Sequence, residues 1–303
     1  MKAWQRDIII CGIAIVATLL ATGGFLGRMT REKKVTQTDL YALVDSSSTS
    51  VLVINRPALF SKMMLSQKGF KDIFSQYIPE VFLSVIQQCP SLPQIVFSFH
   101  EQGIVMYARA DRQAEAKMEG TVFRKLFSTY SPQIQKKGEI EFTYYPDAGN
   151  RYLGYYRHGN IIVASYSKRL LETTARRQLD KQHGGESHFT TLLMALDHNV
   201  PLNIIVPTDS LNLAIQVNDS TEWRIEDRWI TADVYAETRT ICCIGNLPYD
   251  SLGDSLYTPL SDTLCNRLQE IFPKLQIRSQ ADVGTETVYF TTCGKLTSNP
   301  SYE

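Results

Sequence analysis

The chain has 303 residues, of which 44% are hydrophobic and 20% charged, and its 31 basic residues balance its 31 acidic ones. This length can bury a substantial core, as one large domain or two small ones. Residues 1–34 hold six basic and two acidic residues, which leaves 25 basic and 29 acidic residues in the remainder. The net charge of −4 on that remainder gives no electrostatic basis for binding nucleic acid.

An uncharged apolar run extends from residue 8 to residue 27, with Thr18 and Thr22 as its polar side chains. A helix of about 20 residues covers about 30 Å, which is the thickness of the hydrocarbon layer of a bilayer. Several basic residues follow the run at once, beginning with Arg28, and the run is longer than the apolar core of a signal peptide. We predict a short tail (1–7) and an uncleaved transmembrane anchor (8–27), with cleavage after Ala21-Thr22-Gly23 as the alternative.

The flanking charges give only weak guidance on which side of the membrane the large domain lies. The basic residues after the run favour the cytoplasm by the positive-inside rule, but long domains translocate largely regardless of such charges. Residues 28–50 are polar and end in DSSSTS, which predicts a stalk and a Ser-rich loop before the first strand.

The first half of the domain, residues 51–183, alternates between strand and helix patterns. It predicts a strand at 51–57, two or three helices at 58–89 with breaks near Gly69 and Pro79, and a hairpin at 94–110. A helix capped by Asp111, further strands at 139–146, 151–157 and 160–167, and a helix capped by Ser167 follow. The tyrosines of FTYYPDAGNRYLGYY are interpreted as side chains packed on the sheet.

The second half, residues 184–303, begins at Gly184-Gly185 and again alternates between strand and helix patterns. It predicts a helix at 187–199, a strand at 201–207, a hairpin at 220–237, a strand at 240–247, a helix at 259–272 and a closing strand at 285–293. VLVINRP and PLNIIVP share leucine, isoleucine and proline at one offset, which leaves open whether the two halves are diverged repeats. Hairpin connections favour an α+β fold with an antiparallel or mixed sheet and helices packed on one face.

Catalytic and metal-binding motifs are poorly supported. The sequence has no HExxH, CxxC, GxSxG, GxGxxG or P-loop pattern, and its five cysteines beyond the anchor are an odd number. Cys242-Cys243 is interpreted as apolar filling of a strand, and His183, His188 and His198 as solvated loop residues. Ser165 and Lys168 match S-x-x-K, but the predicted helix begins after Ser165, so capping by Ser167 explains the pattern better. No catalytic, cofactor-binding or metal-binding residue is therefore assigned.

The stretches DSSSTSVLVINRPALF and YLGYYRHGNIIVASYSKRLLETTARRQ resemble a family of uncharacterised, single-span membrane-anchored proteins of Gram-negative bacteria. The resemblance follows the order of elements over most of the domain, and it implies an extracytoplasmic location without any catalytic residue. We expect an inner-membrane protein whose periplasmic domain binds an envelope protein or acts as a scaffold. The alternatives are an envelope hydrolase or transferase using residues such as Ser165 and Lys168, or an accessory subunit of a membrane complex.

Overall fold

The computed structural model describes residues 40–45, 47–66, 68–179, 192, 196–207, 214–218, 221–224, 229–237, 240–248, 262–263, 265–266, 269, 275–283 and 287–296. The predicted anchor and the residues up to 39 lie outside this set, as do Gly184-Gly185. Within the described residues, no helix has the length and apolarity needed to cross a bilayer.

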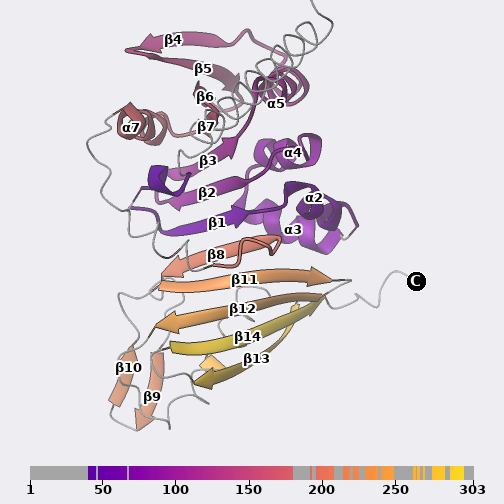
Figure 1. Ribbon diagram of the computed structural model, residues 1–303, viewed down its shortest axis with the longest axis vertical. Coiled ribbons are helices and arrows are strands. Elements are labelled where there is room, and N and C mark those ends of the chain that lie inside the picture. The colour runs from indigo at the N-terminus through magenta and orange to yellow at the C-terminus, as the bar shows by residue number, and fades with distance from the viewer. Residues whose placement is uncertain are drawn as a thin grey trace, which may run out of the picture. The chain divides into compact units, whose positions relative to one another are not determined.

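The described elements form an α+β unit (Figure 1). The helices are η1 (Tyr41–Leu43), α2 (Pro57–Ser66), α3 (Lys68–Tyr77), α4 (Glu80–Gln88), α5 (Arg112–Lys117), the π-helical turn η2 (Met118–Phe123), α6 (Arg124–Leu126) and α7 (Lys168–Leu179). The strands are β1 (Ser50–Ile54), β2 (Ile95–His100), β3 (Gly103–Arg109), β4 (Gln133–Lys137), β5 (Ile140–Asp147), β6 (Arg151–His158), β7 (Ile161–Ser165), β8 (Leu202–Pro207), β9 (Ala214–Asn218), β10 (Thr221–Arg224), β11 (Trp229–Glu237), β12 (Thr240–Pro248), β13 (Leu275–Val283) and β14 (Thr287–Leu296).

Among the described residues, twelve strands form one sheet in the order β13-β14-β12-β11-β8-β1-β2-β3-β7-β6-β5-β4, and β9 and β10 form a separate pair. Every strand pairing is antiparallel, as the predicted hairpins require. The predicted hairpin at 220–237 is wrong, because β10 pairs with β9 and β11 pairs with β12 instead.

The prediction that helices pack on one face of the sheet is also wrong. Val51, Leu52, Val53 and Ile54 of the central strand β1 are all buried, so both faces of the sheet need a cover. Figure 1 shows α7 on one side of the sheet and α2, α3, α4 and α5 on the other. One core joins the sheet to α2, α4 and η2, and the second joins it to α7 and η1.

Helix α7 begins where the sequence predicts and buries one stripe of its surface. The Ser167 hydroxyl accepts from the Leu170 backbone N–H at 3.4 Å, which confirms the predicted cap. Leu171 and Ala175, one turn apart, are buried against the sheet. The cap of α5 is confirmed as well, since an Asp111 carboxylate oxygen accepts from the Ala114 N–H at 2.7 Å.

The contact between α7 and β6 depends on Gly154, and it gives a testable prediction. A Cβ atom at residue 154 would lie 2.7 Å from Leu171 Cδ2 and 2.8 Å from the Tyr144 ring. We expect Gly154→Ala to lower the free energy of unfolding by about 1–3 kcal/mol, because the packed helix and ring must shift. The matched control is Gly120→Ala, where a Cβ meets nothing within 4 Å. Urea unfolding of both variants tests this, and equal stability of the two would contradict it.

Candidate functional site

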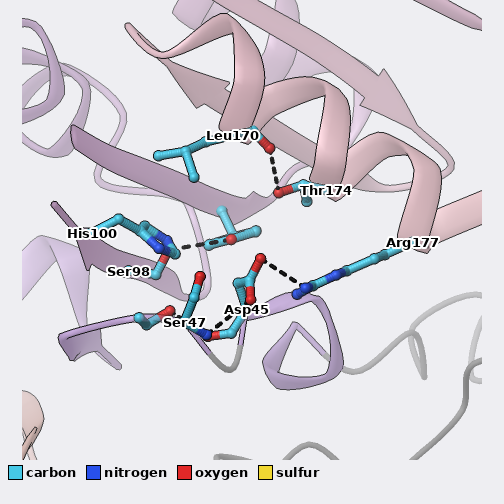
Figure 2. A network of polar contacts seen from close by, with 9 residues as sticks. Asp45, Ser47, Ser98, His100, Leu170, Thr174 and Arg177 are labelled. Atoms are coloured by element: carbon cyan, nitrogen blue, oxygen red, sulfur yellow. Dashed lines mark hydrogen bonds and ion pairs between the residues drawn. The ribbon is translucent and has the colours of Figure 1, made fainter. Parts of the chain in front are cut away.

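A polar network ties the Ser-rich loop before β1 to the end of α7 (Figure 2). Asp45 Oδ2 lies 2.8 Å from Arg177 Nη2, and Asp45 Oδ1 accepts from the Ser47 backbone N–H at 2.9 Å. Burial alone would raise the pKa of Asp45, but the hydrogen bonds from Ser47 and Arg177, with the charge of Arg177, hold it below its usual value. The loop is therefore fastened to the helix by a charged pair.

Next to this pair, β2 and β3 bring together side chains that resemble parts of a catalytic triad. Ser98 Oγ lies 2.8 Å from His100 Nε2 and 3.2 Å from the Tyr107 hydroxyl. The carboxylate of Asp45 acts on His100 electrostatically. A serine, a histidine and an aspartate are therefore close to one another, which the sequence pattern did not indicate because Asp45 is distant in the chain.

The burial of these residues argues against nucleophilic catalysis. Ser98 and Tyr107 are both 0% exposed, so no substrate can reach the serine hydroxyl. Both carboxylate oxygens of Asp45 are bonded to Ser47 and Arg177, and among the described residues the His100 Nδ1 atom has no hydrogen-bond partner. We interpret the cluster as a buried structural network.

The pH dependence of stability should report on His100. Burial lowers the pKa of His100, against a smaller opposing effect of Asp45. Below pH about 6.5 the unfolded chain binds this proton before the folded chain does, so folded stability falls as the pH falls through that value. We expect a loss of up to about 1.4 kcal/mol per pH unit. Urea unfolding between pH 7.5 and 5.5 measures the slope, and His100→Gln should flatten it. An unchanged slope would contradict the assignment.

A second polar network crosses the middle of the sheet, where β8 lies beside β1. Asn55 Nδ2 donates to Asn203 Oδ1 at 2.5 Å, and Asn203 Nδ2 donates to Asp233 Oδ1 at 2.6 Å. Gln94 Nε2 donates to Asn55 Oδ1 at 3.0 Å and to the Tyr41 hydroxyl at 2.8 Å. Asn203 is 0% exposed, so its side-chain amide must satisfy its hydrogen bonds with protein partners such as these. We name the chain Tyr41–Gln94–Asn55–Asn203–Asp233 the seam network.

Residues 196–200 lie against this network. The Asp197 carbonyl accepts from Asn203 Nδ2 at 3.2 Å, and the His198 ring stacks on Tyr41 with centroids 5.8 Å apart. Burial raises the pKa of Asp233, and the charge of Asp197 adds to this, whereas the Asn203 hydrogen bond opposes it. His198 is exposed in a turn, which confirms its interpretation as a solvated loop residue. His183 and His188 lie outside the described residues.

The structure gives Ser165 and Lys168 structural partners. The Ser165 hydroxyl donates to the Ile104 carbonyl at 2.7 Å and accepts from the Ser167 N–H at 3.0 Å. The Lys168 ammonium lies 5.5 Å from the centroid of the Tyr144 ring and 4.0 Å from Glu172 Oε1. This geometry matches a strand end and a helix cap, and it provides no activated nucleophile.

The interpretation of Cys242 as apolar filling is wrong. Cys242 of β12 forms a disulfide with Cys293, which lies directly opposite on β14. Cys243 points to the other face of the strand, remains a free thiol and packs against the first core, and burial raises its pKa to about 12. The sequence could not reveal the disulfide, because the pairing of β12 with β14 joins residues 51 positions apart.

The described residues hold no group of three His, Cys, Asp or Glu side chains arranged to bind a metal ion.

Comparison of the sequence with protein-family profiles and with curated proteins finds no match. Among solved structures, crystal form I of TP0453 is similar with a TM-score of 0.46 and 6% identity, over 84% of this chain and 93% of that chain. Crystal form III of TP0453 gives a TM-score of 0.44 and 6% identity, over 85% of this chain and 94% of that chain.

Proposed function

We propose that the protein is a single-span envelope protein, held in the inner membrane by residues 8–27, whose periplasmic domain is a non-enzymatic binding or scaffold module. The observation that carries this proposal is the Cys242–Cys293 disulfide in a chain that begins with a membrane-spanning pattern. Disulfides form and persist in oxidising compartments and are rare in the cytosol. The disulfide therefore supports export, which the flanking charges leave open.

The scaffold role is supported by the way in which the reactive side chains are used. Ser98 is buried and its hydroxyl is bonded to His100 and Tyr107, and the Ser165 hydroxyl is bonded to the backbone. Polar side chains in the seam network bond to one another across the sheet. Such arrangements fix the shape of a domain and leave recognition to its surface.

We also propose that the two halves of the domain are diverged repeats. From the centre of the sheet outwards, the first half has the order β1-β2-β3-β7-β6 and the second has the order β8-β11-β12-β14-β13. After the third strand of each half, β3 or β12, the chain first forms the outer strand, β6 or β13. It then returns as β7 or β14, which pairs with the third strand. The same order in both halves follows directly from a duplication.

Strand registers support the same proposal. Val53 pairs with Asn203, and the offset between them is the one that relates Leu52 to Leu202 and Ile54 to Ile204. The junction of β1 and β8 is thus symmetric about one residue pair, as expected for two copies of one strand that meet edge to edge.

The neighbouring hairpins continue this agreement. Phe97 lies opposite Leu52 and precedes the turn residue His100 by three positions. In the second half Val234 lies opposite Leu202 and precedes the turn residue Glu237 by the same number. The counterpart of β2 in this alignment is therefore β11.

The location is tested by protease treatment of intact cells and spheroplasts, with mass spectrometry of the amino terminus. We expect the domain to be cut in spheroplasts only, and the mature chain to retain residues 1–27. Protection of the domain in spheroplasts would overturn the periplasmic location, and a terminus near residue 24 would overturn the anchor. A variant with Ser165→Ala and Lys168→Ala should keep the cellular phenotype, whereas its loss would favour an enzyme.

A further inference from the structure

The two edge strands of the twelve-stranded sheet differ in how they are protected. At one end lies β4, whose Lys136 and Lys137 are exposed, and charged lysines on an edge discourage the addition of another strand. At the other end lies β13, a nine-residue strand with the sequence LQIRSQADV. It contains no proline and no lysine, and its one arginine and one aspartate cancel. Among the residues that the structure describes, β13 is therefore a long edge without the usual protection.

In the first half of the domain, the strand that corresponds to β13 is paired with a further antiparallel strand. In Figure 1, β6 and β13 take the same place in their halves, since β6 pairs with the returning strand β7 as β13 pairs with β14. The other edge of β6 is covered by β5, which pairs with it antiparallel. In the described part of the chain, no strand takes the corresponding place beside β13.

We propose that β13 pairs antiparallel with β13 of a second copy of this chain, centred on Gln280, to form a twofold dimer. In this register Arg278, which is exposed, faces residue 282 of the other copy, which is an aspartate. The twofold axis produces this opposite-charge pair twice, and it brings position 277, an isoleucine, opposite position 283, a valine. A shift of the register by one or two residues in either direction removes both charge pairs.

This self-complementarity favours a second copy over an unrelated peptide. A peptide could form backbone hydrogen bonds with any open edge. A second antiparallel copy of β13, however, places its own aspartate at position 282 opposite Arg278, and its own arginine opposite the aspartate of the first copy. The chain already joins its own halves in this way, through the symmetric junction of β1 and β8 centred on Val53 and Asn203. The dimer would thus extend the sheet by the same kind of contact.

Site-directed crosslinking of the full-length protein in mild detergent tests the register. The Gln280→Cys variant places two cysteines opposite each other at the twofold axis, within the reach of a disulfide. We expect most of its chains to become covalent dimers on mild oxidation. Thr291→Cys is the matched control, because Thr291 is exposed and lies opposite Gln280 on β14, one strand further in. Its two copies would be about 14 Å apart, too far for a disulfide. Equal crosslinking of the two variants would overturn the proposal.

A charge exchange tests the same contact without cysteines. Arg278→Glu alone should weaken dimerisation about tenfold, because each attraction becomes a repulsion. Adding Asp282→Lys reverses both charges and should restore the dimer. The control Lys136→Glu, on the opposite edge, should leave the dimer unchanged. Sedimentation of the detergent-solubilised chains measures the dissociation constant. A parent protein that stays monomeric, or a double variant no tighter than the single one, would overturn the proposal.

Discussion

Protein in which Cys242→Ser and Cys293→Ser are combined should unfold with a free energy about 2–4 kcal/mol lower than that of the oxidised parent. The disulfide closes a loop between residues 51 positions apart, and a loop of that length restricts the unfolded chain by an amount that corresponds to about 4 kcal/mol. It also joins β12 to β14, so its loss leaves the outer strands of the second half held by the sheet alone.

Urea unfolding with and without a reducing agent measures this effect and contains its own control. Reduction should lower the stability of the parent protein by the same amount as the double substitution, and it should leave the double variant unchanged. A parent protein that is equally stable in both conditions would show that the bond contributes nothing. The same titration on protein made in the cytosol should show the reduced behaviour throughout, because that compartment keeps thiols reduced.

The limits of sequence-based prediction are clear from the two edge strands. Buried strands such as β1 and β7 carry continuous apolar runs and were predicted, as were the helices that their caps define. The strands β4 and β13 were not predicted, because an edge strand has one strand neighbour and many polar residues, which removes the periodic apolar signal.

The polar networks could not be predicted for a different reason. Asn55 and Asn203 are 148 positions apart, and only the pairing of β8 with β1 brings them together. A single Asn in a strand usually indicates a loop or an exposed face, so nothing local marks Asn203 as buried. The same holds for Asp45, whose partner Arg177 lies at the end of a helix in the middle of the chain.

Replacing Asn203 by valine should lower the free energy of unfolding by about 2–4 kcal/mol. The substitution removes the donor that lies 2.6 Å from the Asp233 carboxylate and the acceptor that Asn55 uses. It leaves a partly buried charge next to an apolar side chain, in a region where burial already raises the pKa of Asp233. Most of this loss comes from leaving the polar groups of Asn55 and Asp233 without a partner, and less of it from the lost hydrogen bonds themselves.

The first half of the domain supplies the compensating change. There Val53 pairs with Val96, and both valines are buried. In the proposed duplication these two residues take the positions of Asn203 and Asp233, which pair in the second half. Asn203→Val combined with Asp233→Val should therefore be more stable than Asn203→Val alone, with a coupling energy of about 1–3 kcal/mol in the double-mutant cycle. Urea unfolding of the parent protein, both single variants and the double variant measures this term. If the two losses of unfolding free energy simply add, Asn203 and Asp233 do not stabilise each other. The proposed correspondence with the valine pair of the first half would then predict nothing about stability at this position.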